Sequence, residues 1–352
     1  CITQSVPLTA EPPAVGVGQW FVTFGSAVLD DEFSTTPIAS NFGVGVTILR
    51  WSVWNPPCTD TSHAEVWITV EDVPTTANAG ADADLCVTNY LLQGNTPVVG
   101  IGMWTLQSGT GTIVDPTLPN TMVTGLGMGP NVFRWTISNA PCNDSFDDVT
   151  ITLLEPPTTA DAGADVDLCN QSSVNLIGNV AVVGAPAWAF VDATPPQPAP
   201  ALAPFANAVS ITGMTLPTMT PITYRFRYFI TNGSCPASSD TVAVTIYPPS
   251  VGGTISGTNT VCSGVATGAL GLTGYVGNVL RWEYSTNNFA TVNTIAIGLP
   301  AIALPPLAQT SRFRAVVQSG PCAIAYSDTF LVNVFLGPLG GTATIEPISV
   351  AE

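Results

Sequence analysis

The stretch Arg134-Trp135-Thr136-Ile137-Ser138-Asn139-Ala140-Pro141-Cys142 occurs in four versions along the chain. In every version an Arg precedes a Cys by eight residues, and another Cys followed by a Trp lies upstream in the same order. The Arg residues are Arg50, Arg134, Arg227 and Arg314, and the Trp residues are Trp20, Trp104, Trp188 and Trp282. This order, repeated at a period of about 85 residues, predicts a tandem array of small domains.

Apolar and polar side chains alternate in the strand that each version of the stretch predicts. In the first version Leu49, Trp51 and Val53 alternate with Arg50 and Ser52, which is the period of a half-buried antiparallel strand. Sustained helical spacing is almost absent, while short strands are separated by turn signals about every 8–12 residues. The sequence therefore predicts an all-β chain, a tandem array of four immunoglobulin-like antiparallel β-sandwich domains with one disulfide each.

The repeat also predicts the domain boundaries. The four domains, called repeats 1 to 4 below, are expected at residues 1–76, 77–157, 158–249 and 250–336, followed by a tail at 337–352. Repeat 1 lacks the strand that precedes the first Cys in the other repeats, and repeat 3 contains a Pro-rich loop at 191–205.

The tail repeats the opening of repeat 4. Gly340-Gly341-Thr342 matches Gly252-Gly253-Thr254, and Val350-Ala351 falls about where Val261-Cys262 would. We expect the tail to be the first strand of a fifth repeat or a strand exchanged with a neighbouring subunit. We also expect the sequence to be an interior slice of a longer array.

The eight cysteines form four pairs of similar spacing. The repeat predicts the disulfides Cys1–Cys58, Cys86–Cys142, Cys169–Cys235 and Cys262–Cys322, each clamping one pole of its own sandwich. Zinc binding is disfavoured because no CxxC pair exists and His63 is the only His. Free thiols and a lipidated Cys1 are the alternatives. Disulfides predict an oxidising location, so we expect a protein that is secreted to the cell surface or the extracellular space.

The charge balance excludes several classes of partner. The net charge is −17, and the seven basic residues are all Arg. Nucleic acid and anionic lipid surfaces require clustered positive charge, so neither is an expected partner. No transmembrane segment and no signal peptide are recognisable.

No catalytic constellation recurs in the repeats. His63, which the other repeats lack, is predicted in the polar turn Thr59-Asp60-Thr61-Ser62-His63. Lys nucleophiles are excluded by composition, and no pair of carboxylates has a distinctive context. We therefore expect that the protein is not an enzyme and requires no cofactor.

Each recurring Arg is followed by an acid near the start of the next strand. These acids are Glu65, Asp147 or Asp148, Asp240 and Asp328. We predict structural cross-strand ion pairs for Arg50, Arg134, Arg227 and Arg314. The alternative is that the Arg residues bind the carboxylate of a ligand. Alternation places Asp240 and Asp328 on the inward side, so pairing there would need a bulge or a position at the start of the strand.

Acidic residues also gather before the first Cys of repeats 2 and 3. Asp82, Asp84, Asp165 and Asp167 are candidate Ca²⁺ ligands at the domain junctions, because Ca²⁺ prefers several oxygen ligands. The alternative is that these side chains are simply solvated.

The motif Asn78-Ala79-Gly80-Ala81-Asp82, followed by Leu85-Cys86, Gly102-Met103-Trp104 and Phe133-Arg134-Trp135, resembles PKD-like and immunoglobulin-like repeats in large secreted and cell-surface proteins of the Bacteroidota. The resemblance extends over essentially the whole chain. It implies export by type IX secretion and a role in gliding, adhesion or an extracellular filament. Asp240-Thr241-Val242 is similar to the O-glycosylation site of such proteins, which implies a glycan on Thr241.

These observations predict a non-enzymatic extracellular structural or adhesive repeat protein that forms a rod or filament at the bacterial cell surface. Its expected partners are neighbouring copies of itself or further repeats of the same chain, either in an adhesin stalk or in a polymerised filament. The alternative is an array of carbohydrate-binding or ligand-binding modules attached to a secreted enzyme, with surface glycans as partners. Trp54 and Trp67, which lie off the repeat pattern, are the residues that favour the alternative.

Overall fold

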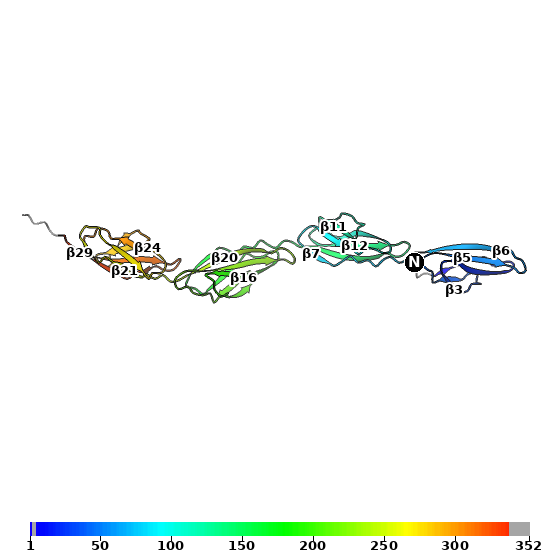
Figure 1. Ribbon diagram of the computed structural model, residues 1–352, viewed down its shortest axis with the longest axis horizontal. Coiled ribbons are helices and arrows are strands. Elements are labelled where there is room, and N and C mark those ends of the chain that lie inside the picture. The colour runs from blue at the N-terminus through cyan, green and yellow to red at the C-terminus, as the bar shows by residue number, and fades with distance from the viewer. Residues whose placement is uncertain (2–4, 338–352) are drawn as a thin grey trace, which may run out of the picture. The chain divides into compact units, whose positions relative to one another are not determined.

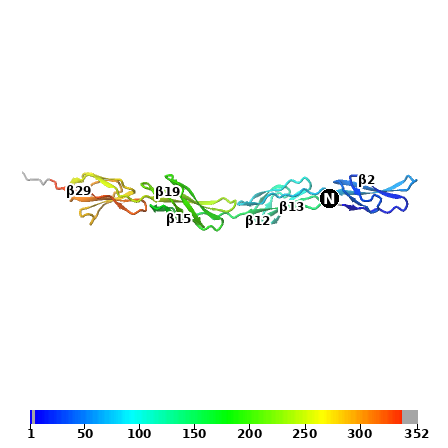
Figure 2. The same cartoon turned by 90° about the horizontal axis from the view of Figure 1, so that it is seen from below.

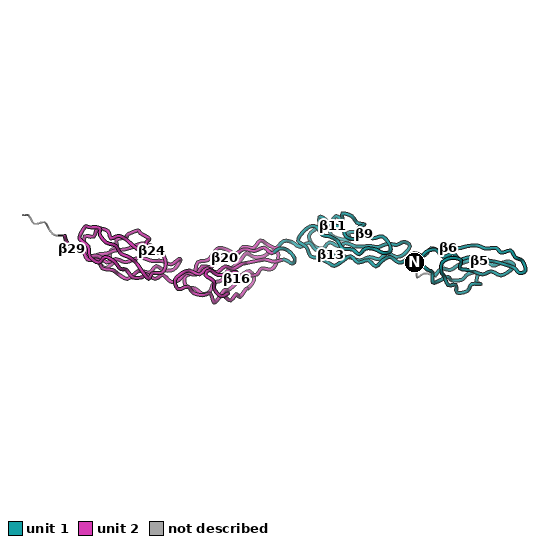
Figure 3. The backbone as a smooth tube through the Cα atoms, viewed as in Figure 1, with its two compact units in different colours: residues 1–156, 232–236 teal, residues 157–231, 237–352 magenta. Residues whose placement is uncertain are grey.

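The computed structural model describes residue 1 and residues 5–337, and the regular elements of this part of the chain are all β-strands (Figure 1). Two compact units are distinguished: residues 1–156 with 232–236, and residues 157–231 with 237–352 (Figure 3). The predicted all-β class is confirmed.

In the first unit, repeat 1 forms two three-stranded sheets. One has the order β1-β4-β3 and consists of β1 (Val6–Pro7), β3 (Val28–Leu29) and β4 (Ile38–Ser40). The other has the order β2-β5-β6 and consists of β2 (Val17–Phe24), β5 (Gly45–Trp54) and β6 (Thr61–Val70). Trp20, Leu49 and Trp51 form the centre of the core between the sheets.

Repeat 2, also in the first unit, adds a fourth strand to its larger sheet. The smaller sheet, β10-β11-β8, consists of β8 (Tyr90–Gln93), β10 (Thr112–Ile113) and β11 (Asn120–Thr124). The larger sheet, β7-β13-β12-β9, consists of β7 (Ala83–Leu85), β9 (Ile101–Ser108), β12 (Gly129–Ser138) and β13 (Ser145–Leu153). Figure 2 shows β12 and β13 side by side.

In the second unit, repeat 3 has the same plan. Its smaller sheet, β15-β18-β17, consists of β15 (Ser173–Ile177), β17 (Ala201–Phe205) and β18 (Ala208–Thr212). Its larger sheet, β14-β20-β19-β16, consists of β14 (Val166–Cys169), β16 (Ala185–Thr194), β19 (Ile222–Thr231) and β20 (Ser238–Tyr247). The Pro-rich loop expected at 191–205 is therefore partly strand, within β16 and β17.

Repeat 4 has a larger second sheet. Its smaller sheet, β21-β23-β26, consists of β21 (Thr254–Gly257), β23 (Ala269–Thr273) and β26 (Ala301–Ala303). The other sheet has the order β22-β29-β27-β24-β25 and consists of β22 (Thr260–Cys262), β24 (Asn278–Ser285), β25 (Asn293–Ile295), β27 (Ser311–Gln318) and β29 (Phe330–Phe335), with β28 (Ala325–Tyr326) paired to β27.

A parallel strand pair in repeats 2, 3 and 4 departs from the predicted antiparallel pattern. β7, β14 and β22, each leading into the first Cys of its repeat, pair in parallel with β13, β20 and β29. Parallel neighbours need a long connection, and here the rest of the repeat supplies it. In the part of the chain that the structure describes, β6 of repeat 1 has no such neighbour and forms the edge of its sheet.

The Gly-x-Trp motif is explained by close packing of two indoles. A Cβ on Gly102 would lie 2.1 Å from Cζ2 of Trp135, so only Gly lets this ring lie against β9. The rings of Trp104 and Trp135 lie 5.1 Å apart between centroids. All four repeated Trp side chains are buried.

Candidate functional site: the repeat junctions and a groove in repeat 1

The disulfides join consecutive repeats, so the predicted pairing within each repeat is wrong. The three bonds in the structure are Cys1–Cys142, Cys86–Cys235 and Cys169–Cys322. Each links the first Cys of one repeat to the second Cys of the next repeat. Cys58 and Cys262, which were predicted to form disulfides, are unpaired and exposed.

Strand length explains why pairing within a repeat fails. Cys86 directly follows β7, whose last residue lies beside Leu153 at the end of β13. Cys142 lies in the turn before Ser145, at the start of β13. The nine residues of β13 extend over roughly 27 Å, far beyond the roughly 7 Å that a disulfide allows between Cα atoms. The two cysteines of one repeat therefore lie at opposite poles.

The turn that carries the second Cys contacts the end of the preceding repeat. In the first junction the side-chain amide of Asn139 donates a hydrogen bond from Nδ2 to Asp72 O at 2.8 Å, and Sγ of Cys142 lies 3.7 Å from Glu71 O. At the next junction Asn232 donates in the same way to Glu155 O at 2.7 Å. The repeated turn is thus a docking element as well as a disulfide partner.

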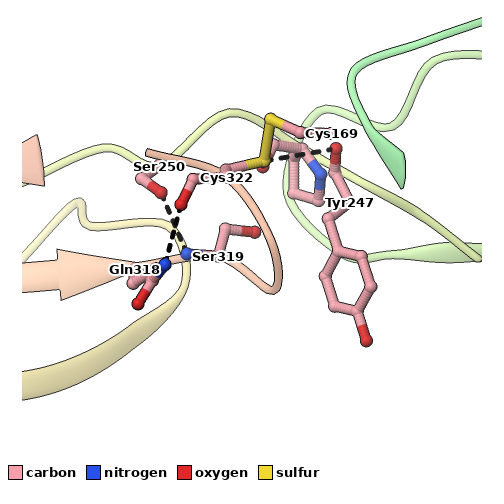
Figure 4. The surroundings of a disulfide bond; sticks show 7 residues. Cys169, Tyr247, Ser250, Gln318, Ser319 and Cys322 are labelled. Atoms are coloured by element: carbon pink, nitrogen blue, oxygen red, sulfur yellow. Dashed lines mark hydrogen bonds between the residues drawn. A yellow bond between two sulfur atoms is a disulfide. The ribbon is translucent and has the colours of Figure 1, made fainter. Parts of the chain in front are cut away.

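The junction within the second unit uses Ser in place of Asn. Figure 4 shows the Cys169–Cys322 bond beside Tyr247, with Ser319 N donating to Ser250 Oγ at 2.9 Å. A Cβ on Gly320 would lie 2.4 Å from the ring of Tyr247, so the turn approaches this ring closely. Cys322 is buried at this contact.

Alkylation will test this disulfide pattern. In the chain purified as a monomer, iodoacetamide without reductant is expected to label Cys58 and Cys262 only, because their thiols are exposed and unpaired. Peptide mapping by mass spectrometry is the measurement. A Cys1–Cys58 or Cys86–Cys142 linked peptide would contradict the pattern.

Two of the four predicted ion pairs have the expected partners. Arg50 Nη2 lies 2.7 Å from Glu65 Oε1. Arg134 binds Asp148 through two bonds, Nε to Oδ1 at 2.8 Å and Nη2 to Oδ2 at 2.9 Å. Both pairs join residues directly opposite one another on neighbouring strands. The arrangement is that of structural cross-strand pairs.

The other two predicted pairings are wrong. Arg227 lies opposite Thr241 and its guanidinium is 5.1 Å from the ring centroid of Phe229, while Arg225 pairs with Asp192 instead. Asp240 lies opposite the buried Tyr228, on the inward side that alternation predicts, and accepts a hydrogen bond from Ala162 N.

Arg314 also pairs with an acid that the sequence did not indicate. Its Nη2 lies 2.7 Å from Oε2 of Glu283, whose side chain is only 5% exposed. Arg281 binds the other carboxylate oxygen, so one buried acid has two Arg partners. Asp328, the predicted partner, accepts from Ile255 N.

The Arg134–Asp148 pair makes stability depend on pH. The hydrogen bond from Arg134 lowers the pKa of Asp148 below its ordinary value, outweighing the opposing effect of burial. The pKa of Asp148 is therefore lower in the folded chain than in the unfolded chain. The pair stabilises the fold fully at pH values above the unfolded pKa, and this stabilisation is lost as the pH falls through the folded pKa.

We expect Arg134→Gln to raise the pKa of Asp148 towards its ordinary value, because the charged donor is removed. Side-chain NMR titration of the carboxyl carbon measures this. Arg227→Gln is the control and should leave Asp148 unchanged, since Arg227 contacts Phe229 in repeat 3. If the Asp148 pKa is the same in the Arg134→Gln variant, the hydrogen bond from Arg134 is not what lowers it.

Two of the four aspartates proposed as Ca²⁺ ligands accept main-chain hydrogen bonds within their own repeats. Asp82 accepts a hydrogen bond from Thr150 N and Asp165 accepts one from Ala243 N, both at 2.8 Å. No group of three or more His, Cys, Asp or Glu side chains suited to a metal occurs within residues 1 and 5–337. The structure therefore does not assemble Asp82, Asp84, Asp165 and Asp167 into the expected Ca²⁺ site.

Two other predicted positions are exposed on strands. His63 lies in β6, opposite Ser52, rather than in a turn. Thr241 lies in β20 and is exposed, so its predicted glycosylation stays a prediction.

Repeat 1 contains a groove that no sequence motif indicates. Its volume is about 560 Å³, and it is lined by the loop 9–14, by Trp20, Trp51 and Val53, and by Ser62, His63, Ala64 and Val66 of β6. Trp51 Nε1 is buried at this groove without a hydrogen-bond partner among the described residues. The unpaired edge of β6 bounds the same region.

The fold and the junctions define a class: tandem immunoglobulin-like β-sandwiches with disulfides between consecutive repeats. A family model described as "Domain of unknown function (DUF8696)" matches residues 251–335. No curated protein matches the chain. No helix among the described residues has the length and apolar character needed to cross a membrane.

Several solved structures are similar to the chain at low identity. Sidekick-1 immunoglobulin domains 1-5 are 11% identical, with a TM-score of 0.34, over 95% of this chain and 78% of that one. A Dscam structure is 10% identical, with a TM-score of 0.32, over 95% of each chain. Protocadherin Gamma B2 extracellular cadherin domains 3-6 are 10% identical, with a TM-score of 0.28, over 96% of each chain.

Proposed function

We propose that this chain is a non-enzymatic extracellular structural or adhesive repeat protein, which forms a rod or filament at a bacterial cell surface. The observation that carries the proposal is the set of three disulfides, each of which joins consecutive repeats. Covalent links at the junctions serve a chain that must transmit force from one domain to the next. A protein whose domains bind independent ligands does not need them.

The chemistry of the repeats supports the same proposal. Disulfides persist in oxidising compartments, which favours a secreted protein. The repeated Arg side chains at positions 50, 134 and 314 pair with acids of their own repeats, so they are engaged in the fold rather than offered to a ligand. Type IX secretion and an origin in the Bacteroidota remain part of the proposal through the sequence motifs.

Electron microscopy of native material tests the proposal. Rods or ordered filaments made of this chain are the expected result. Compact monomers that never assemble and attach to no surface would refute it. Immunogold labelling of intact cells tests the cell-surface location separately.

One observation favours the carbohydrate-binding alternative. Trp67 on β6 is 66% exposed, and exposed aromatic rings are platforms on which sugars stack. Glycan-array binding that Trp67→Ala abolishes would support this alternative. The control is Phe146→Ala, which removes an exposed ring on the equivalent strand of repeat 2.

A further inference from the structure

We propose that the groove of repeat 1 is the docking site for the C-terminal tail of a second copy of this chain, and that Cys262 of that copy forms a disulfide with Cys58. The inference rests on the proposed filament function and specifies its subunit contact. Two independent features carry it: an uncovered groove with a buried unpartnered group, and two unpaired cysteines that are halves of a repeated junction.

The groove corresponds to a place that is filled in repeat 2. There the segment 76–82 lies along the start of β13, with Ala77 N donating to Ser145 Oγ at 2.9 Å and Ala79 N donating to Asp147 Oδ2 at 2.8 Å. Both alanines are buried in the core. This segment is the one that enters β7 and then reaches the first Cys of the repeat.

Repeat 3 fills the same place with its own segment. Ala160 N donates to Ser238 Oγ and Ala162 N donates to Asp240 Oδ2, each at 2.8 Å. The hydrogen bonds and the buried alanines thus repeat those of repeat 2, so the occupied groove is a property of the repeat.

In repeat 1 the described residues leave this place uncovered. Val66 is 36% exposed, whereas its counterpart Val149 is 1% exposed. Trp51 Nε1 is buried without a partner, whereas the counterpart Trp135 Nε1 donates to Asn95 O at 3.2 Å. The segment 76–82 holds Asn95 in place, since its side chain donates to Thr76 O and accepts from Asn78 N. An apolar surface and a buried donor are therefore left without the covering segment that the other repeats have.

The register identifies what the missing segment must contact. Ala64 lies opposite Trp51, as Asp147 lies opposite Trp135, so the main chain of β6 has the same register as that of β13, while Ala64 lacks the carboxylate acceptor that Asp147 supplies. In repeat 2 that edge pairs in parallel with β7. The occupant of the groove is therefore an extended segment with small side chains followed by a short strand.

The tail of this chain has that sequence. The segment begins seven positions after the equivalent residue of the last strand in each case: Val70 to Ala77, Leu153 to Ala160, Ile246 to Gly253 and Val334 to Gly341. Ala343 then takes the position of Ala79, and Ile348-Ser349-Val350 repeats the apolar–polar–apolar pattern of Val166-Asp167-Leu168. One residue later than in repeat 4, Ala351 stands where the other repeats have their first Cys.

The cysteines give the same assignment independently. Cys262 ends β22, which pairs in parallel with β29, just as Cys169 ends β14 and Cys86 directly follows β7. Cys58 N donates to Asn55 O at 2.9 Å, and Cys142 N makes the same turn with Asn139 O at 3.0 Å. Each unpaired Cys is thus half of a junction that is completed three times within the chain.

Cys262 and Cys58 are complementary, because one is a first Cys and the other is a second Cys of a repeat. The completed junctions always pair a first Cys with a second Cys, so the contact is head-to-tail between Cys262 of one copy and Cys58 of the next. The tail that follows repeat 4 then enters repeat 1 of that next copy, as each linker enters the repeat after it. A heterologous contact of this kind extends without limit unless it closes into a ring.

Disulfide formation requires an oxidant, and oxidised glutathione is sufficient. The Cys58 thiolate attacks the glutathione disulfide and releases one glutathione thiolate. The Cys262 thiolate of the other copy then attacks the mixed disulfide and releases the second. Two protein thiols become one disulfide, and one glutathione disulfide becomes two glutathione molecules.

The first test follows covalent assembly in a glutathione redox buffer. The full chain is expected to give a ladder of multiples of 36.4 kDa on non-reducing gels, which reductant collapses. Cys58→Ser and Cys262→Ser should each stay monomeric alone, and their equimolar mixture should give dimers and nothing larger. Dimers from either variant alone, or a Cys58 bonded to any peptide other than that of Cys262, would overturn the proposal.

The second test addresses the groove without the disulfide. A chain ending at residue 337 is mixed with a synthetic peptide of residues 338–351, and the indole N–H resonance of Trp51 is followed by NMR. The peptide should shift this resonance, while a peptide with Ala343→Arg should not. A Trp51 signal that the native peptide leaves unchanged would overturn the docking assignment.

The two proposals fail separately. This inference would be refuted by filaments that contain no Cys58–Cys262 disulfide and still form from a chain without residues 338–352. Such filaments would leave the proposed function supported. Monomers that bind glycans and never assemble would end the proposed function as well.

Discussion

Replacing Cys169 and Cys322 together by Ala is expected to destabilise the second unit by about 5 kcal/mol. The chain-entropy model gives this value for a closed loop of 153 residues, because the cross-link restricts the unfolded chain. Ala is chosen because Cys322 is buried, and a Ser hydroxyl there would need a new hydrogen-bond partner. Differential scanning calorimetry measures the effect as a lower unfolding temperature.

The matched control replaces Cys58 and Cys262, also by Ala, in the chain kept as a monomer. Both are unpaired and exposed, so their loss should leave the unfolding transition where it is. If the two double variants unfold alike, the Cys169–Cys322 bond does not constrain the unfolded chain.

Trp104→Ala is expected to destabilise repeat 2 by about 3–5 kcal/mol. The side chain is 1% exposed, packs against Trp135 and donates from Nε1 to Pro119 O at 3.0 Å. Truncation therefore removes buried apolar area, leaves a cavity and strands a carbonyl acceptor. Urea denaturation followed by fluorescence measures the change.

Met103→Ala is the control for this substitution, since Met103 directly precedes Trp104 in β9 and is 51% exposed. Its effect should stay within about 0.5 kcal/mol. Equal urea midpoints for the Trp104 and Met103 variants would mean that Trp104 contributes no core packing.

The sandwich cores were predictable because their signal is local. Alternation in Leu49-Arg50-Trp51 and the recurring Gly-x-Trp motif fix which side chains face inward, and inward faces must pack on one another. The disulfide partners were not predictable in the same way. Equal spacing shows that Cys86 and Cys169 are equivalent, but it does not say whether an equivalent Cys bonds within its repeat or to the next.

The missing information was the pole at which each Cys lies. The length of β13 contains this information. Cys142 lies just before β13 begins, and Cys86 lies beside the end of β13, so the length of the strand separates the two cysteines. The parallel pairing of β7 was needed to use it, and parallel pairing has no short-range signal.

The candidate site was predictable only in part. Cross-strand acids at 65 and 148 follow from simple alternation. The pairing of Glu283 with Arg314 does not follow from alternation. Glu283 lies on β24, which precedes β27 in the chain, whereas the expected acid was on the side of β27 that faces β29. The groove of repeat 1 is defined by a covering segment, so its detection required the other repeats in three dimensions.

The overlap of the disulfide loops limits how far the oxidised chain can be stretched. The loops 1–142, 86–235 and 169–322 interleave, so the shortest covalent path from Cys1 to Cys322 passes through two disulfides and only the 27 residues from Cys142 to Cys169. Fully extended, that path is about 95 Å long, whereas the reduced chain between the same residues would reach about 1,100 Å. Even with every sandwich unfolded under tension, Cys1 and Cys322 of the oxidised chain could separate no farther than this path allows, so the disulfides set the maximum extension between these two residues.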